Sequence, residues 1–178
     1  MIQKIYKVTQ ILAFVPFMAI PSVSVSSHIG SLEAKPVTKE VVSIEDQRKE
    51  HADVINKFFK DRNMPLSGSG MTFVLVAEKY GLDWRLLPAI GVRESSGGKA
   101  ACGYNAFGWG SCKLHNFNSY EEAIESLGKN LGGAKKSTSR YYAGKSTEEK
   151  LYYYNGSVEP AYPDEVIAIM SMISESAE

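Results

Sequence analysis

Apolar residues recur at helical spacing in several separate stretches, and this pattern constrains the fold more than any other feature of the sequence. Each such stretch has one apolar face, which must be buried against a neighbouring element. Glycines follow several of them, as expected where helices end. The pattern predicts a mainly α domain. Its predicted helices run from Ser43 to about Asn63, Met71 to Tyr80, Asp83 to Glu94 or Ser95, Tyr120 to about Leu131, Thr147 to Tyr154, and about Pro163 to Ser174.

Capping residues set most of these predicted boundaries. Ser43 and Asp46 resemble a capping box that opens the first helix, and Ser119 with Glu122 opens the fourth. Asp83 and Thr147 are the predicted caps of the third and fifth helices. Pro88 lies inside the third stretch, where it removes a backbone donor and predicts either a kink or a late start. Residues 99–117 contain glycines and aromatics but little helical pattern. This segment is predicted to be a compact loop or a small hairpin.

The composition indicates a globular protein. The chain has 178 residues, of which 44% are apolar and 22% charged, enough for one domain with a hydrophobic core. Lys and Arg together number 20, as do Asp and Glu, so no basic excess attracts a nucleic acid. Nucleic-acid binding is therefore disfavoured.

The N-terminus has the features of an export signal. Lys4 and Lys7 precede an apolar stretch at residues 11–20 that is short for a membrane span of about 20 residues. We predict a signal peptide at 1–27, a linker at 28–42, an N-terminal helix and connector at 43–66, and the main domain at 67–178. An uncleaved membrane anchor is the alternative for 1–27. Either reading predicts a secreted or cell-envelope protein.

Two cysteines, Cys102 and Cys112, lie in the part of the chain predicted to be exported. In an oxidising compartment a disulfide between them is the natural interpretation, and two free thiols are the alternative. The three histidines, His28, His51 and His115, are scattered and show no ligand spacing with these cysteines. No metal site and no organic cofactor are expected.

Glu94 is the candidate catalytic residue. Leu87, Ile90 and Glu94 are three and four residues apart, so they share a helix face that the apolar side chains require to be buried. A carboxyl group on such a face is desolvated, which raises its pKa and keeps a proton available near neutral pH. It can then protonate a glycosidic oxygen. Alternatively, Glu94 pairs with Arg85 or Arg93, or faces solvent at the helix end.

The segment Asn105–Gly110 is a candidate sugar-binding loop. It supplies two aromatic rings, an amide and two glycines, and glycine lets a ligand approach the main chain. Alternatively, Phe107 and Trp109 cap the core. The tyrosines at 152–154 and Tyr162 belong either to the core or to a cleft. Three adjacent tyrosines cannot all be buried on one helix, so at least one is expected to be exposed.

Five short runs of residues resemble parts of the bacterial glucosaminidase domain. They are Ala77–Leu82, Leu87–Gly98, Asn105–Gly110, Phe117–Ile124 and Tyr162–Ile167, and the resemblance covers roughly residues 71–175. Members of this family cleave peptidoglycan and are also described as mannosyl-glycoprotein endo-β-N-acetylglucosaminidase-like domains.

The resemblance implies a lysozyme-like α-rich domain with a small irregular or β-hairpin lobe. It also implies that Glu94 is the general acid and that Tyr162 lies near the cleaved bond. The residues expected to bind substrate are Tyr104, Asn105, Phe107, Gly108 and Trp109.

One departure from the family affects the chemistry. Members that use a second acid place it in the lobe after the catalytic helix, but no Asp or Glu lies between Ser95 and Tyr120. A two-carboxylate glycosidase holds its acids about 5–9.5 Å apart. The residues Glu121, Glu122 and Glu125 follow on a helix where they are expected to face solvent. The sequence thus suggests a mechanism with a single acid.

The expected function is that of an exported peptidoglycan hydrolase that cleaves the β-1,4 glycan strand as an endo-β-N-acetylglucosaminidase. One alternative is a lytic transglycosylase acting on the same polymer. Another, from a different class, is a non-catalytic peptidoglycan-binding module. The expected partner is the glycan strand, and a membrane is involved only if the N-terminal segment remains as an anchor.

Overall fold

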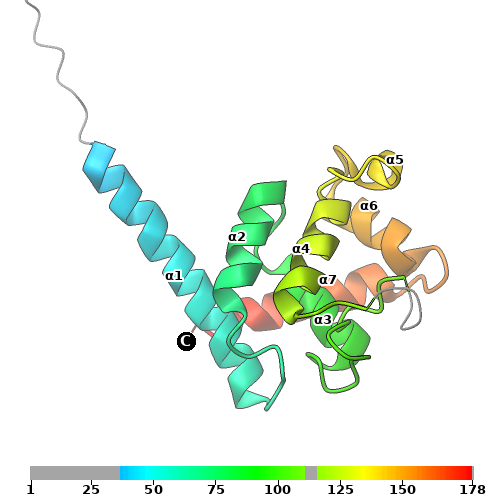
Figure 1. Ribbon diagram of the computed structural model, residues 1–178, viewed down its shortest axis with the longest axis horizontal. Helices are drawn as coiled ribbons and strands as arrows, with labels where there is room; N and C mark the ends of the chain where they lie inside the picture. The colour runs from blue at the N-terminus through cyan, green and yellow to red at the C-terminus, as the bar shows by residue number, and fades with distance from the viewer. Residues whose placement is uncertain (1–36, 111–115, 178) are drawn as a thin grey trace, which may run out of the picture. The chain divides into compact units, whose positions relative to one another are not determined.

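The computed structural model describes residues 37–110 and 116–177, and helices account for most of them (Figure 1), which confirms the mainly α class. The predicted signal peptide, residues 28–36 and Cys112 lie outside the described residues. The helices are α1 (Val37–Asp61), α2 (Gly70–Tyr80), α3 (Leu86–Ser95), α4 (Tyr120–Leu131), α5 (Ser139–Tyr142), α6 (Thr147–Leu151) and α7 (Tyr162–Glu175), and a π-helical turn, η1 (Tyr152–Gly156), follows α6.

The first helix begins earlier than the sequence pattern predicted. Residues 37–42, assigned to the linker, are the first residues of α1, so Ser43 lies inside the helix and does not cap it. No Gly or Pro between Val37 and Val42 stops a helix there, and a capping signal alone does not end one. The predicted end near Asn63 agrees with Asp61, and the predicted inward face is buried.

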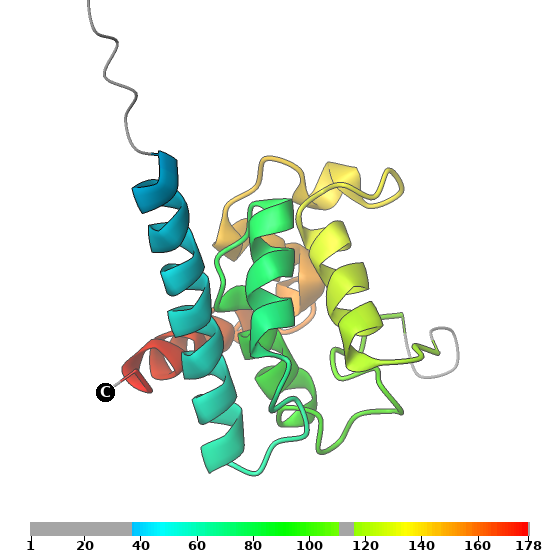
Figure 2. The same cartoon turned by 60° about the vertical axis from the view of Figure 1, so that its left-hand side comes forward.

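Three helices form one side of the core. α1 packs against α2 and α2 packs against α4, and the three stand side by side in Figure 2. Their apolar faces enclose aromatic side chains, with the rings of Phe59 and Phe73 5.9 Å apart and those of Phe73 and Phe107 6.3 Å apart. Phe107 belongs to the loop after α3, so the core itself anchors that loop.

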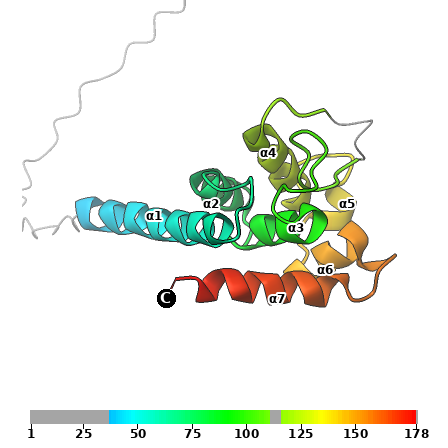
Figure 3. The same cartoon turned by 90° about the horizontal axis from the view of Figure 1, so that it is seen from below.

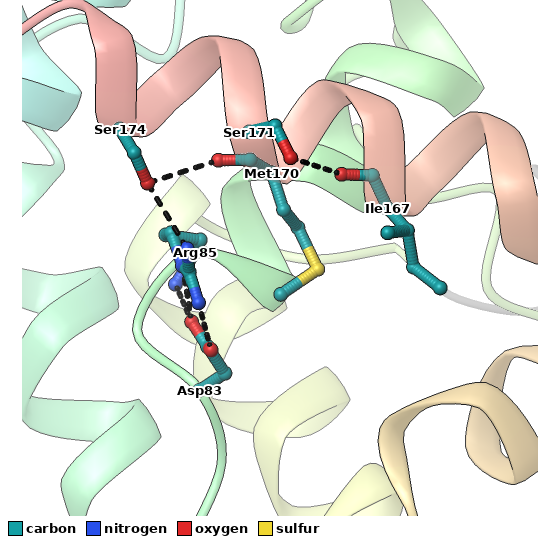
Figure 4. A network of polar contacts seen from close by, with 6 residues as sticks. All are labelled: Asp83, Arg85, Ile167, Met170, Ser171 and Ser174. Carbon is teal, nitrogen blue, oxygen red and sulfur yellow. Dashed lines mark hydrogen bonds and ion pairs between the residues drawn. The ribbon is translucent and has the colours of Figure 1, made fainter.

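The other side of the core is the pair α3 and α7. Figure 3 shows α7 running along α3, and the two helices are in extensive contact. Before α3 begins, the Arg85 guanidinium donates a 3.0 Å hydrogen bond to the hydroxyl of Ser174, near the end of α7 (Figure 4). The start of α3 therefore lies beside the end of α7, which makes the pair antiparallel.

Pro88 gives α3 the late start that was one of its two predicted effects. The helix begins at Leu86, so Pro88 occupies the third helical position, where its missing N–H has no intrahelical partner to lose. Asp83 does not cap the helix as predicted. Its carboxylate accepts hydrogen bonds from the backbone and the guanidinium of Arg85 instead (Figure 4).

The start of α4 follows its predicted capping signal, whereas α6 ends at Leu151, before the predicted end at Tyr154, and continues as η1. Ser119 accepts a hydrogen bond from the backbone of Glu122 at the start of α4, as predicted. α6 is capped one residue earlier than predicted, by Ser146 in a capping box with Glu149. The sequence pattern missed α5. Between residues 99 and 117, the described residues form turns and one isolated bridge, from Cys102 to Asn105, and no strand.

None of the helices in the described part of the chain is both long and apolar enough to cross a membrane.

Candidate active site

Glu94 lies in the last turn of α3, at a well-defined helix end. Ser96 adopts the left-handed conformation with φ 51°, and its N–H and that of Gly97 bond back to carbonyl groups of α3. The buried hydroxyl of Ser95 donates a 2.7 Å hydrogen bond to the carbonyl of Ala106 and accepts one from the N–H of Gly98. These contacts fasten the end of α3 to the loop that follows it, which places Glu94 beside that loop.

The carboxyl group of Glu94 has one direct partner in the described residues. The hydroxyl of Tyr162, the first residue of α7, donates a hydrogen bond of 2.6 Å to Oε1 of Glu94. The predicted alternative, an ion pair with an arginine, is wrong. Arg85 pairs with Asp83, and Arg93 pairs with two other acids.

Burial raises the pKa of Glu94 above its ordinary value, as its position on the helix face predicted. The hydrogen bond from Tyr162 and the positive charge of Arg93 act in the opposite direction, and the negative charge of Glu159 adds to the effect of burial. Burial also raises the pKa of Tyr162 far above its usual range. Tyr162 is therefore a neutral hydrogen-bond donor, and Glu94 holds its proton more readily than an exposed glutamate does.

A pocket of about 430 Å³ opens beside Glu94. Its volume lies within the 300–1,000 Å³ range typical of small-ligand sites. Two segments of the chain form it with the end of α3, namely the loop at residues 107–110 and the region from α5 to η1. The lining residues are Glu94, Phe107, Gly108, Trp109, Gly110, Tyr142, Tyr154 and Asn155.

The loop at residues 105–110 is closed by the side chain of Asn105. Its amide donates to the carbonyl of Trp109 and accepts from the N–H of the same residue, at 2.9 and 3.2 Å. Asn105 is 3% exposed and does not line the pocket, so the structure gives it a supporting position and not one in contact with a ligand. Phe107 is buried in the core, whereas Trp109 is partly exposed beside the pocket.

Gly108 approaches the carboxyl group of Glu94 closely. It has a φ of +62°, and a Cβ atom at this position would lie 3.0 Å from Oε2 of Glu94. Oε2 is the oxygen that Tyr162 does not bond, and no hydrogen bond from the described residues reaches it. The bare backbone of Gly108 therefore leaves room for another molecule next to the unbonded oxygen.

Two predicted features lie apart from this pocket. Tyr104 is exposed, packs edge-on against the ring of Tyr120 at 5.2 Å, and does not line the pocket. Cys102 is also exposed. Its predicted disulfide partner, Cys112, lies outside the described residues, so the disulfide stays a prediction.

Tyr142, Tyr154 and Asn155 line the pocket but were not predicted as site residues. The ring of Tyr154 stacks on that of Tyr162 at 5.8 Å and lies 5.6 Å from that of Trp109, and its hydroxyl bonds the carbonyl of Phe107.

The run of three tyrosines was the sequence signal for Tyr154. As expected, not all three are buried, since Tyr152 and Tyr153 are exposed. Nothing in the sequence singled out Tyr142.

None of the other described acids lines the pocket. Glu121 and Glu122 are exposed, as expected. Glu125 accepts hydrogen bonds from Lys79 and Tyr80, which lower its pKa. Glu159 bonds Arg93 at 2.6 Å and the side-chain amide of Asn155 at 3.2 Å. Glu94 is thus the one carboxyl group among the described residues that line the pocket.

No cluster of three potential metal ligands occurs among the described residues. Comparison with models of protein families, with curated proteins and with solved structures finds no significant match to this chain.

Proposed function

We propose that the protein is an exported glycoside hydrolase that cleaves the β-1,4 glycan strand of peptidoglycan as an endo-β-N-acetylglucosaminidase. The observation that carries this proposal is the partly buried carboxyl group of Glu94, with its raised pKa, in a pocket lined by aromatic rings. A carboxylic acid that keeps its proton is what general-acid cleavage of a glycosidic bond requires. Aromatic rings and bare glycine backbone suit the faces of sugar rings.

In the proposed reaction Oε2 of Glu94 carries the proton and delivers it to the bridging oxygen. The bond from that oxygen to the anomeric carbon breaks, and positive charge develops on the sugar. Tyr162 holds Oε1 and so fixes the orientation of the carboxyl group. As the proton leaves, the hydroxyl of Tyr162 stabilises the carboxylate that forms.

The developing cation must be trapped by a nucleophile. No second carboxylate lines the described part of the pocket, and none occurs in the sequence between Ser95 and Tyr120. This favours either direct attack by water or attack by the N-acetyl group of the substrate followed by attack of water on the cyclic intermediate, and both routes yield hydrolysis. The same observation favours one second candidate, a lytic transglycosylase, in which the 6-hydroxyl of the sugar attacks and an anhydro product forms.

The resemblance to the bacterial glucosaminidase domain supports the same substrate. It pairs Glu94 with Tyr162, and these two residues are hydrogen-bonded. A lysozyme-like arrangement of the helices belongs to this proposal, as do export through the predicted signal peptide and the irregular or hairpin lobe after α3.

The test is digestion of purified peptidoglycan with the protein and with its Glu94→Gln variant, followed by mass spectrometry of the products. The glutamine keeps an oxygen for Tyr162 to bond but has no proton to transfer. General-acid catalysis contributes about 10²–10⁴-fold, so the variant is expected to lose activity by at least that range. Reducible ends on N-acetylglucosamine are the expected products of the wild-type protein.

The other outcomes discriminate among the candidates. Anhydro-muramic ends identify the transglycosylase. Intact strands that retain the wild-type protein identify a binding module and contradict both enzymes. Equal activity of the wild-type and Glu94→Gln proteins contradicts the role of Glu94.

A further inference from the structure

The aromatic lining of the pocket continues onto the protein surface. The ring of Trp109 lies 6.4 Å from that of Tyr142, which lies 6.4 Å from that of Tyr141. Tyr141 is 5.6 Å from Tyr153, and Tyr153 is 5.4 Å from Tyr152. The rings therefore form a continuous series that begins in the pocket and ends outside it. We call its outer part, Tyr141, Tyr152 and Tyr153, the tyrosine track.

Two rings of the tyrosine track are exposed in a way that core packing does not explain, whereas Tyr141 is partly buried against the core. Tyr152 is 51% exposed and Tyr153 is 40% exposed, although both rings are large and apolar. They belong to η1, directly after α6, and Tyr141 belongs to α5, which adjoins α6 (Figure 1). None of the three lines the pocket. The track thus offers ring surface to a molecule outside the protein.

The pocket is too small to hold the whole of the proposed substrate. A volume of about 430 Å³ is that of a small-ligand site, whereas a glycan strand is a long polymer. The sugars beyond those in the pocket must cross the adjoining surface. A tyrosine ring has a flat apolar face that matches the C–H face of a pyranose, and its hydroxyl can bond sugar hydroxyl groups.

The charge beside the track also fits the strand of peptidoglycan. The guanidinium of Arg140 lies 4.5 Å from the centre of the Tyr141 ring. In the described part of the chain, no carboxylate pairs with Arg140. Peptidoglycan carries acidic peptide substituents along its glycan strand, so a cation at the edge of the track has the complementary charge.

We propose that the tyrosine track binds sugar units of a β-1,4-linked hexosamine strand that lie beyond the pocket. This inference rests on the proposed function, because it takes the pocket as the place where the strand is cleaved. It adds that the protein prefers long strands to short oligosaccharides.

The test uses the full chain with Glu94→Gln, so that no cleavage occurs, and two probes, chitobiose and chitohexaose. Tryptophan fluorescence reports binding, because Trp109 lines the pocket. The protein is expected to bind chitohexaose more tightly than chitobiose. Adding Tyr152→Ala and Tyr153→Ala is expected to weaken chitohexaose binding about tenfold and to leave chitobiose binding unchanged, since each aromatic contact contributes a modest free energy.

Matched variants separate ring stacking from other effects. Phenylalanine at both positions keeps the flat ring and is expected to retain most of the affinity for chitohexaose, whereas leucine at both positions keeps only apolar area and is expected not to. Met172→Ala removes an exposed apolar side chain from α7 and is the control expected to change nothing. Equal melting temperatures verify that the variants are folded.

Three results overturn the inference. They are unchanged chitohexaose affinity in the double alanine variant, full rescue by leucine, and no measurable chitohexaose binding by the Glu94→Gln protein. The proposed function is tested separately by cleavage. If the wild-type protein cleaves nothing but binding depends on the tyrosine track, the proposed binding role of the track is supported and the proposed enzyme activity is contradicted. If cleavage occurs and the tyrosine variants bind chitohexaose normally, the proposed enzyme activity is supported and the proposed binding role of the track is contradicted.

Discussion

The hydroxyl of Tyr162 lies 2.6 Å from Oε1 of Glu94, although the two residues are 68 positions apart in the sequence. The hydrogen bond between them stabilises the carboxylate and lowers the pKa of Glu94, whereas burial raises it more strongly. Burial and the hydrogen bond therefore act on the pKa of Glu94 in opposite directions. The pKa of Glu94 also depends on the neighbouring side chains of Arg93 and Glu159, and each neighbour can be substituted separately.

Tyr162→Phe is expected to shift the pH dependence of cleavage upward. The substitution keeps the ring but removes the hydrogen bond that lowers the pKa of Glu94, so this pKa rises further. A general acid loses activity as the pH rises through its pKa, and the alkaline limb of the profile should move to higher pH. The measurement is kcat/KM against pH. Tyr120→Phe, at the start of α4, is the control, and an unmoved limb in Tyr162→Phe would show that the hydrogen bond does not tune the acid.

Arg93→Gln and Glu159→Gln are expected to shift the same limb in opposite directions. The charge of Arg93 lowers the pKa of Glu94 and that of Glu159 raises it. Removing Arg93 should therefore move the alkaline limb up, and removing Glu159 should move it down. Both side chains are partly exposed, so added salt should reduce both shifts. Shifts of the same sign would contradict this electrostatic account.

Gly108→Ala is expected to reduce cleavage much more than its effect on stability would suggest. A Cβ atom at Gly108 would lie 3.0 Å from Oε2 of Glu94, so the carboxyl group must move. The rate depends on the exact placement of the catalytic group, so a displacement of even a few tenths of an ångström is expected to reduce cleavage. The left-handed conformation adds about 1–2 kcal/mol to the cost in stability.

Gly103→Ala is the matched control for this change. Gly103 has a similar φ of +59°, but a Cβ atom there would meet nothing within 4 Å. Denaturant unfolding should show comparable losses of stability in the two variants, whereas only Gly108→Ala should lose activity. Similar losses of activity in both would mean that backbone strain, and not contact with Glu94, is responsible.

Glu94→Gln is expected to stabilise the fold at neutral pH while it abolishes cleavage. The pKa of Glu94 is higher in the folded state than in the unfolded state, so the folded protein binds the proton more tightly. The free energy of unfolding therefore falls as the pH rises from the pKa of Glu94 in the unfolded state to its pKa in the folded state. Glutamine has no such proton. The stability advantage of the variant should be small near pH 4 and should grow towards pH 7, as measured by urea unfolding. An advantage independent of pH would contradict the raised pKa.

Tyr154→Phe is expected to destabilise the protein by about 1–3 kcal/mol, because the buried carbonyl of Phe107 loses the hydroxyl that bonds it. The loop over the pocket should loosen, with a rise in KM. Tyr153→Phe is the control, since its hydroxyl is on an exposed side chain, and a change within about 0.5 kcal/mol is expected. Equal effects in these neighbouring tyrosines would contradict the proposed anchoring of the loop.

The parts of the fold that depend on local signals were predictable from the sequence. α2, α4 and α7 match the predicted helices to within about a residue, because apolar spacing marks all three and a glycine, a cap or a proline marks an end of each. The start of α1 was missed because Ser43 has a capping residue type but no conformational break precedes it. Local signals indicate where a helix can begin, and only the surrounding residues decide whether an earlier turn also forms.

The site was predictable only in part, because most of it depends on contacts between distant segments. The partial burial of Glu94 could be predicted from its spacing to Leu87 and Ile90, because all three residues lie on one helix. The residue opposite it, Tyr162, came from a resemblance to a family and not from spacing. Tyr142 and Tyr154 line the pocket because a one-turn helix and a π-helical turn point them inward, and neither element has a clear sequence signal.

The antiparallel pairing of α3 with α7 has a consequence for the order in which the candidate site forms during folding. Chains are made from the N-terminus, so Glu94 is available for folding before Tyr162 is. A nascent chain that lacks α7 has an acid without its hydrogen-bond donor, on a helix whose apolar side is still uncovered. The docking of α7 completes both the core and the hydrogen bond between Tyr162 and Glu94, so full packing and a complete candidate site arise in the same step.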